Sequence, residues 1–407
     1  MRRITFYLTC LFVFSIPLEQ LLDTEGVISI SRIAGAAAIG LGVLTVLTTG
    51  RVRRPGYILV LSIPFVFANV VSLFWTISVD ASIQRVFTYA QLVAVVWLFG
   101  EFATEEWHLQ RVFAWYCFGS VVAIANDFRN FALGLSYRTS AGDIRFAATN
   151  FDPNEFGITL AIGIPLAWYL VLHGRGAARI VAAASIPLAA VAILLTGSRA
   201  AFLAVIVGLS IIPLTVSPRS VASWLKVVAV LVLAGAAVGW VVPYTLWERV
   251  LTVGQELEGG TMSGRTVIWD AGLRVFRESP LLGVGAGAFA AAVEPAVGAR
   301  ASHNVFLALL VEQGIVGFLT FAALLLACAW RIRHSPIQQR RFWIIVAIVW
   351  LIGALSLSWQ SAKITWLLMS LLSTRAVRDT KRTQASPALP QPRHRDFGGV
   401  RGLPQPS

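Results

Sequence analysis

The sequence predicts an all-α fold, a polytopic bundle of about twelve transmembrane helices with one large external loop that contains short helices. Its 407 residues are 57% hydrophobic and 13% charged, and the mean hydropathy is +0.74. This composition excludes an ordinary water-soluble core. Apolar runs long enough to cross about 30 Å of hydrocarbon recur along the chain, and basic residues gather in alternate connections between them.

The predicted spans form a single integral membrane domain over residues 1–375. Met1-Arg2-Arg3 precedes the first span, which could instead be a signal peptide, but no small-x-small cleavage site follows it. We therefore predict an uncleaved first helix. The spans cover 4–22, 33–49, 56–76, 83–102, 108–126, 155–172, 178–196, 200–216, 223–242, 303–330, 341–358 and 361–375.

The basic residues predict the orientation of the chain. RVRRPG at 51–56 and RIRHSPIQQRR at 331–341 are the strongest basic segments, and the positive-inside rule places them and both termini in the cytoplasm. This bias explains the net charge of +13 without a nucleic-acid-binding domain. Residues 376–407 are rich in Pro and Arg and are predicted to form a disordered cytoplasmic tail.

Two external connections are long enough to hold structure, residues 127–154 and residues 243–302. Structureless loops beyond about 12–15 residues are uncommon in compact domains unless they carry a function. Both connections fall on the same side of the membrane in this topology. We therefore look for functional residues in these connections and at the helix ends beside them.

The segment SGRTVIWDAGLRVFRESPLLGVG in the larger connection predicts a helix with Ser263 as its N-cap and an end at Pro280. At 100° per residue, Arg265 falls on the apolar face with Trp269, whereas Arg274 and Arg277 lie on a solvated face. A cation near a helix N-terminus opposes the helix dipole. Arg265 is therefore a candidate for contact with an anion.

A second basic candidate is Arg199, in LLTGSRAAFLA between the seventh and eighth spans. The turn is so short that Arg199 lies at the external membrane boundary, where a simple snorkelling arginine is the alternative interpretation. Thr196, Gly197 and Ser198 place hydroxyl and backbone donors beside it at a predicted helix N-terminus. That combination suits a phosphate.

Of the five His residues, only His303 faces outward in this topology. One external His cannot build a histidine-ligated zinc site, and no external Asp-x-Asp pair offers a site for a divalent metal, so a reaction without a metal is favoured. The ordinary pKa of His suits a general base near neutral pH. The alternative is that His303 is a capping or interface residue.

Glu312 lies nine residues beyond His303, which is about 13 Å deeper in the membrane by helix rise. A carboxyl group at that depth is expected to face the bundle and to hold helices together. Gly314 and Gly317 beside it would permit close helix approach, which supports this structural interpretation.

These segments together resemble the O-antigen ligase and O-antigen polymerase superfamily. The resemblance rests on TGSRAAFLA, SGRTVIWDAGLRVFRESPLLGVGAGAF and SHNVFLALLVEQGIVGF in that order, and on NFDPNEFG at 150–157. It covers about residues 145–330. Each motif alone is weak, but the ordered set is fairly specific.

The resemblance implies a bacterial, GT-C-like glycosyltransferase of the cytoplasmic membrane that takes a glycan from undecaprenyl diphosphate at the outer face, without a metal or other cofactor. Arg199 matches the arginine of the Gly-Ser-Arg motif, Arg265 that of Gly-Arg, and His303 the histidine of His-Asn; these three are the predicted catalytic residues. Glu312 matches the Glu before Gly-x-x-Gly and is predicted to be structural. Predicted substrate-binding residues are Asn304, Asp152, Glu155 and Ser198.

Several functions stay open at this point. A ligase transfers finished glycan to lipid A core or another acceptor, whereas a polymerase extends lipid-linked repeats of O-antigen, exopolysaccharide or capsule. A transporter of lipid-linked sugar is a different class. Transporters usually show paired repeats with broken helices at matching positions, and the sequence shows no such pairing, so enzymatic transfer is favoured. A purely structural membrane subunit would not require His303 and Arg265.

Overall fold

The computed structural model describes residues 1–21, 30–138, 144–215, 239, 243–251 and 264–374. The fold is helical, and it opens with α1 (Arg2–Ser15), the short η1 (Ile16–Leu18), α2 (Ile30–Thr49), α3 (Tyr57–Val71), η2 (Ser72–Phe74), α4 (Val79–Phe102) and α5 (Glu106–Ala132). After two short strands come α6 (Pro153–His173), α7 (Gly176–Leu195), α8 (Arg199–Leu209), α9 (Ile211–Thr215) and α11 (Tyr244–Leu251). The remaining elements are α13 (Arg265–Glu278), α14 (Phe289–Val297), α15 (Val305–Arg333), α16 (Ile337–Ala354), η3 (Trp359–Ser361) and α17 (Lys363–Ser373).

The helices coincide with eleven of the twelve predicted spans. The ninth predicted span, 223–242, lies outside the described residues apart from Gly239, and so does the predicted tail at 376–407. Among the described residues, 7 helices are long and apolar enough to cross a membrane. The chain is therefore a multi-pass helical membrane protein, while the full count of twelve spans stays a prediction.

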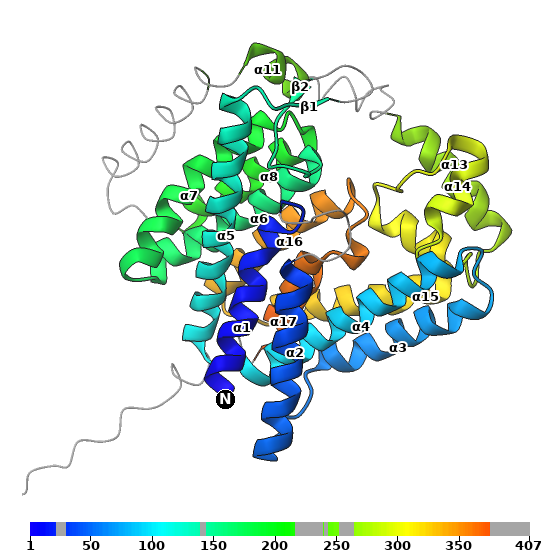
Figure 1. The fold of residues 1–407 in the computed structure, drawn as a ribbon, viewed down its shortest axis with the longest axis horizontal. Helices are drawn as coiled ribbons and strands as arrows, with labels where there is room; N and C mark the ends of the chain where they lie inside the picture. The colour runs from blue at the N-terminus through cyan, green and yellow to red at the C-terminus, as the bar shows by residue number, and fades with distance from the viewer. Residues whose placement is uncertain (22–29, 139–143, 216–238, 240–242, 252–263, 375–407) are drawn as a thin grey trace, which may run out of the picture.

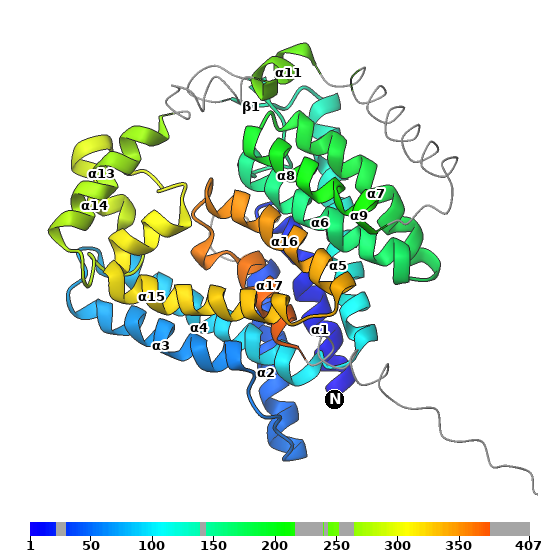
Figure 2. The same ribbon diagram turned by 180° about the vertical axis from the view of Figure 1, so that it is seen from behind.

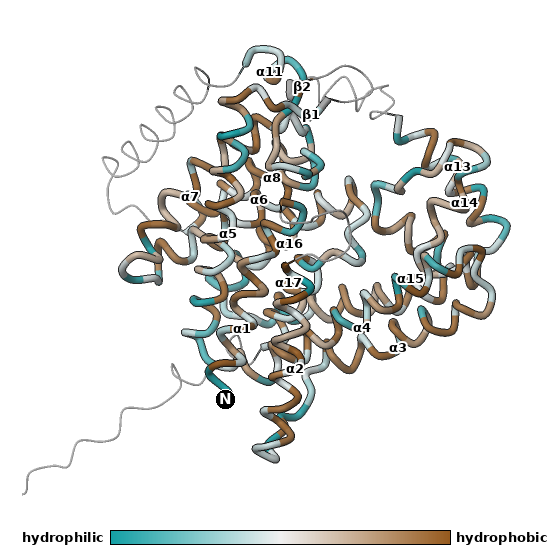
Figure 3. Tube along the Cα trace, viewed as in Figure 1, coloured by the Kyte–Doolittle hydropathy of each residue, from teal (hydrophilic) through white to brown (hydrophobic). Residues whose placement is uncertain are grey.

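The helices form two packed groups joined through α1, α2, α16 and α17 (Figures 1 and 2). In one group α6 packs against α5, α7 and α8, and in the other α3, α4 and α15 run side by side. Hydrophobic residues follow the helices and hydrophilic ones concentrate toward their ends and in the connections (Figure 3). The most enclosed span is α6, whose Phe156, Ile162 and Leu166 are fully buried.

A pair of short strands is the one departure from an all-α fold in the described part of the chain. Strands β1 (Tyr137–Arg138) and β2 (Ile144–Arg145) are antiparallel and two residues long each. Beyond β2, the Phe146 N–H donates to the Leu195 carbonyl oxygen at 3.0 Å. The external connection 127–154 is thereby attached to the end of α7.

The second external connection contributes α13 and α14, as its length predicted. Helix α13 ends at Glu278 before Pro280, which confirms the predicted stop. The predicted N-cap is wrong: Gly264, with φ +81°, occupies that position, and Ser263 lies outside the described residues. A left-handed residue is natural for glycine, which has no Cβ to clash with the backbone.

Helix α15 is broken in its first half, at Gly314, where φ is +62° and ψ is −165°. A continuous helix would bond Ile315 N–H to Val311 O and Val316 N–H to Glu312 O. Instead, these four groups bond to the segment 280–285 of the external connection. The donors and acceptors are Ile315 N to Pro280 O (2.8 Å), Val316 N to Leu281 O (3.2 Å), Val284 N to Val311 O (3.0 Å) and Gly285 N to Glu312 O (2.8 Å).

This backbone joint between 280–285 and α15 requires glycine on both sides. A Cβ at Gly283 would overlap the backbone of Glu312 to Gly314, and a Cβ at Gly314 would overlap the Leu281 carbonyl group. The prediction that Gly314 allows two helices to approach is therefore corrected, because the close partner is an external segment. The joint fixes α13 and α14 to the end of the bundle.

Candidate active site

Four helix N-termini carry the predicted site residues. Asp152 is the N-cap of α6, Ser198 the N-cap of α8 and Asn304 the N-cap of α15, while Arg265 opens α13. Helix N-termini carry unsatisfied N–H groups and a partial positive charge, which favour anions. The sequence predicted these residues separately, and the structure shows electrostatic interactions of Asp152 with Arg265 and His303, and of Arg199 with Arg265.

The capping contacts use side-chain atoms that were predicted to bind substrate. One Asp152 carboxylate oxygen accepts from Asn154 N at 2.8 Å and Glu155 N at 3.2 Å. Asn304 Oδ1 likewise accepts from Phe306 N and Leu307 N, at 2.9 and 3.1 Å. Ser198 is buried, and its hydroxyl accepts from Ala201 N at 3.4 Å. These side chains therefore stabilise helix starts in the structure, whatever else they do.

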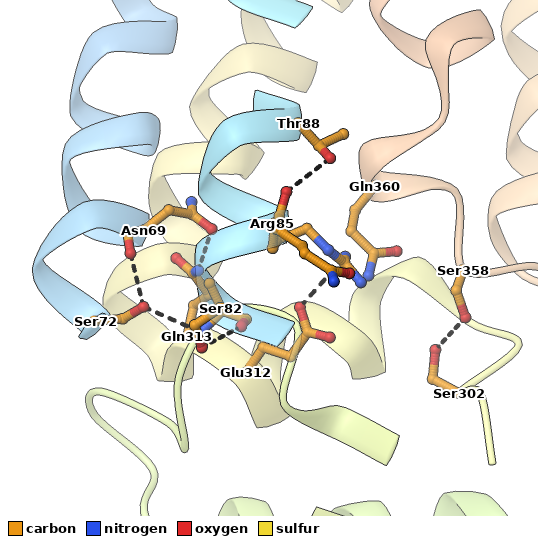
Figure 4. Close-up of polar contacts among 12 residues, drawn as sticks. Asn69, Ser72, Ser82, Arg85, Thr88, Ser302, Glu312, Gln313, Ser358 and Gln360 are labelled. Carbon is orange, nitrogen blue, oxygen red and sulfur yellow. Dashed lines mark hydrogen bonds and ion pairs between the residues drawn. The ribbon is translucent and has the colours of Figure 1, made fainter. Parts of the chain in front are cut away.

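His303 lies directly before α15 in a left-handed conformation, with φ +49°. Its N–H donates to Ser358 Oγ at 3.1 Å, and Ser358 Oγ also lies 2.8 Å from Ser302 Oγ (Figure 4). A non-glycine residue at positive φ is uncommon and is enriched at functional sites. Ser358, which the sequence analysis did not single out, thus helps to hold the strained backbone of His303.

Arg265 is tied to His303 through α13. Trp269, one helical turn after Arg265, donates its indole N–H to the Ser302 carbonyl oxygen at 2.9 Å. Residues four apart lie on the same helix face, so Arg265 lies on the side of α13 that meets the start of α15. Behind this contact, Gly272 packs closely against Phe289 and Leu307.

The charges of the predicted site residues act on one another. Burial lowers the pKa of the Arg265 guanidinium, the nearby Asp152 carboxylate acts in the opposite direction, and Arg199 lowers it further. Burial also lowers the pKa of the His303 imidazole; Arg265 and Arg300 lower it too, while Asp152 raises it. Asp152 therefore interacts electrostatically with both Arg265 and His303, Arg199 interacts with Arg265, and the lowered pKa of His303 favours its neutral form.

Arg199 opens α8 after the N-cap Ser198, which follows Gly197 with φ +56°. Its Nε donates to the Arg249 carbonyl oxygen at 3.2 Å, and Arg249 Nε donates back to the Gly197 carbonyl oxygen at 3.2 Å. Arg249 belongs to α11, so this reciprocal pair attaches α11 to the turn between α7 and α8. Arg249 could not be predicted as a site residue from the sequence, because nothing in its local pattern separates it from a solvated arginine.

Arg145 is another residue that sequence reasoning missed. It is buried; its Nε donates to the Thr196 carbonyl oxygen at 2.6 Å and its Nη2 donates to Asn154 Oδ1 at 2.9 Å. It therefore links the turn that carries Arg199 to the start of α6, which carries Asp152. The one feature of the sequence that could have indicated a role for Arg145 is its position in the long connection 127–154.

Glu155 lies on α6 one turn into the bundle from Asp152. Gln20 Nε2 donates to Glu155 Oε2 at 2.7 Å, and Gln20 Oε1 accepts from Asp152 N at 3.3 Å. The end of the first predicted span thus contacts the site, although the sequence resemblance begins only near residue 145. Nothing in the sequence marked Gln20 as a site residue, because it is a single amide at the end of an apolar run.

Glu312 lies in a separate, buried polar cluster at the break in α15 (Figure 4). Its carboxylate is 3.6 Å from Arg85 Nη1 on α4, and the neighbouring Gln313 donates to Asn69 Oδ1 on α3. Ser82 on α4 donates to the Ala286 carbonyl oxygen at 2.6 Å. This cluster binds α3 and α4 to the backbone joint, in keeping with the structural role predicted for Glu312.

A comparison with known families finds a match. Residues 184–322 match the family model described as O-antigen ligase. This part of the chain is similar to O-antigen ligases. The match supports the resemblance to the O-antigen ligase and polymerase superfamily, and the matched residues include Arg199, Arg265, His303 and Glu312. Asp152 precedes the matched residues.

The match to the O-antigen ligase family, in a chain with several membrane-length helices, supports a membrane glycosyltransferase of the ligase or polymerase type that acts on lipid-linked glycans. The comparison with curated proteins finds no match to the chain.

Proposed function

We propose that the protein transfers a glycan from undecaprenyl diphosphate to an acceptor sugar, of lipid A core or another glycan, at the outer face of the bacterial cytoplasmic membrane. The observation that carries this proposal is the electrostatic coupling of Asp152 to Arg265 and His303, and of Arg199 to Arg265, at the N-termini of α6, α8, α13 and α15. Two guanidinium groups brought together at helix N-termini suit a diphosphate.

In this reaction the bond between the anomeric carbon and the diphosphate oxygen breaks while the acceptor hydroxyl forms a new bond to that carbon. Negative charge builds on the leaving oxygen, and Arg199 and Arg265 stabilise it. His303, held neutral by burial and by neighbouring positive charge, takes the proton of the attacking hydroxyl. A single displacement inverts the configuration at the anomeric carbon.

Asp152 has a supporting part in this proposal. Its carboxylate is close enough to raise the pKa of both Arg265 and His303, so it stabilises the imidazolium that forms when His303 takes the proton. Asn304 fixes the start of α15 next to His303 through its two capping bonds. Glu155 and Ser198 contribute to the walls and helix starts around the site.

The test is transfer from synthetic undecaprenyl diphosphate-linked glycan by purified protein, with excess chelator in one arm. The variants are His303→Asn, Arg199→Ala and Arg265→Ala; Asn is chosen because it tolerates the left-handed conformation that His303 adopts. We expect each variant to lose at least ~100-fold in rate, as for removal of a general base or an oxyanion donor. Arg274→Ala, on the exposed face of α13, is the matched arginine control.

Product size separates the candidate reactions. Single additions that persist in chelator identify a metal-independent ligase, and a ladder of repeat multiples identifies a polymerase. Three variants that turn over like wild type would remove the proposed site. Donor left intact with every acceptor offered, together with passage of donor lipid across a vesicle membrane, would make the protein a transporter.

A further inference from the structure

A cavity of about 640 Å³ lies between α1, α2, α4, α6 and the segment that joins α16 to α17. Two residues that line this cavity also contact residues of the candidate active site. Ser358, whose hydroxyl accepts the His303 N–H, lines it, and so does Gln20, which bonds to both Asp152 N and Glu155. A ligand in this cavity is therefore adjacent to the backbone of the predicted general base.

The charged side chains of the cavity lie toward the end nearest the site. Beyond Arg32, the lining along α2 and α4 is mostly apolar, with Thr88 and Gln91 of α4 as its polar members. On α2, Arg32 and Gly40 both line it and are separated by about 12 Å of helix rise. Its polar lining includes Glu19, Gln20, Arg32, Glu155, Ser358 and Lys363, and its apolar lining includes Phe12, Ile39, Leu92 and Val95.

The polar end is electrostatically balanced, unlike the arginine site. Lys363 Nζ donates to the Glu19 carboxylate and, at 2.7 Å, to Ser31 Oγ. The lining pairs two cationic side chains with two carboxyl groups, and amides lie between them. Such a set of donors and acceptors fits neutral sugar hydroxyl groups better than it fits a diphosphate.

Trp359 strengthens this assignment. It lines the cavity at the polar end and is buried, and its indole N–H lies near the Glu155 carboxyl group without forming a hydrogen bond of good geometry. An indole beside carboxyl and amide groups is suited to a sugar ring.

We propose that this cavity binds the lipid-carried acceptor, with an uncharged sugar residue at the Lys363–Trp359 end and the hydrocarbon along α2 and α4. This inference rests on the proposed transfer reaction, in which the donor diphosphate occupies the arginine site. The two substrates then meet at His303, one from each side.

A kinetic test uses a substitution at Gly40 that reduces the volume of the cavity. An added Cβ at Gly40 meets nothing within 4 Å, so Gly40→Leu fills space in the apolar part of the cavity without a clash. Gly100 on α4 is a helical glycine with equally open surroundings that does not line the cavity, so Gly100→Leu is the control. We expect Gly40→Leu to raise KM for the acceptor at least tenfold and to leave KM for the donor within twofold.

A raised KM for the donor alone would assign the cavity to the donor lipid, and unchanged KM values for both substrates would remove the cavity from catalysis. Either result overturns the proposal. Gly100→Leu should keep both wild-type KM values.

A binding test works without turnover, so it separates failure of this inference from failure of the proposed reaction. Cysteine is placed at Ser361, at the polar end of the cavity, and at exposed Ala296 on α14 as the control. The native cysteines are buried. Dodecyl maltoside, a neutral disaccharide on an alkyl chain, should slow maleimide labelling of Ser361→Cys at least fivefold in nanodiscs and leave Ala296→Cys unchanged. Equal slowing at both positions, or none at Ser361→Cys, would overturn the inference.

Discussion

The two polar regions of the segment Ala301 to Phe318 differ in every physical respect. At its head, His303 and Asn304 are half-buried, and the backbone of His303 is left-handed. Farther along, Glu312 is buried and ion-paired with Arg85, and the helix breaks at Gly314 to accept an external segment. The head interacts electrostatically with Arg265, Asp152 and Arg300, whereas the groups at the break bond to other groups of the protein.

This contrast shows how to interpret polar residues in an apolar run. At the break, the four backbone groups that lose their helical hydrogen bonds have partners in the segment 280–285, and the Glu312 carboxylate has Arg85. This is the arrangement expected of a structural joint. At the head, Arg199 and Arg265 act on one another as like charges, and Arg265 also acts on His303. The proposed anionic ligand would compensate these charges.

Replacement of Gly283 by Ala should have the largest effect. The new Cβ would overlap the backbone of α15 at the joint, and a positive φ adds strain. We expect little folded protein by size-exclusion chromatography, and a greatly lowered Tm for what remains. Gly298→Ala is the matched control, because Gly298 also has a positive φ but its Cβ position is open. Equal loss in both variants would show that strain, not the joint, determines stability.

Replacement of Glu312 by Gln should leave the partly buried Arg85 guanidinium without its partner and destabilise the protein by about 2 kcal/mol. Thermal unfolding would show a lowered Tm, while the transfer rate per folded molecule would stay near wild type. Adding Arg85→Met should restore part of the loss, because no unpaired charge then remains. Glu294→Gln, at an exposed position, is the control. A specific activity that falls with Tm unchanged would move Glu312 into the chemistry.

The pH dependence of transfer should follow His303. Its pKa lies below the ordinary value of about 6.5, so the neutral base is present above that pKa and the rate falls only as pH drops through it. Asp152→Asn removes the charge that raises this pKa and should move the acidic limb to lower pH. Arg300→Gln removes a charge that lowers it and should move the limb to higher pH. Profiles of kcat/KM against pH that coincide for all three proteins would exclude His303 as the titrating base.

Replacement of Ser358 by Ala should have the smallest effect. It removes the hydrogen bond from His303 N–H and the contact with Ser302, each worth about 1 kcal/mol. We expect kcat to fall by less than tenfold with the fold intact. Ser358→Thr keeps the hydroxyl group and should retain most of the rate. A larger loss in the Thr variant than in the Ala variant would argue against a positioning role.

Sequence reasoning predicted what depends on local pattern. Apolar run length located the helices, and Arg265 and His303 could be selected because a cation at a helix start and a lone external His conflict with their surroundings. Contacts between segments that are distant in the sequence could not be predicted in this way. Arg145 and Ser358 look ordinary in the sequence, and they matter because folding places them against Thr196 and His303.

The break in α15 was also beyond the sequence. Gly314 and Gly283 are 31 positions apart, and each is compatible with helix packing or with a simple turn. The one fact that decides between these is that backbone groups on both sides are exchanged across the break. Periodicity reports which face of a helix is apolar, and it does not report which carbonyl groups have lost their helical partners.

The joint at Gly314 has a consequence for how the protein responds to its lipid environment. Helices adjust to bilayers of different thickness by tilting. The segment 280–285 that follows α13 is joined to α15 by backbone bonds at the break, and Trp269 of α13 bonds to the Ser302 carbonyl oxygen, so Arg265 and His303 should tilt as one body. Arg199 belongs to the other packed group, with α6 and α8. Membrane thickness would therefore act on the separation between the two arginines, and short-chain or long-chain lipids would change affinity for the diphosphate more than the alignment of the base.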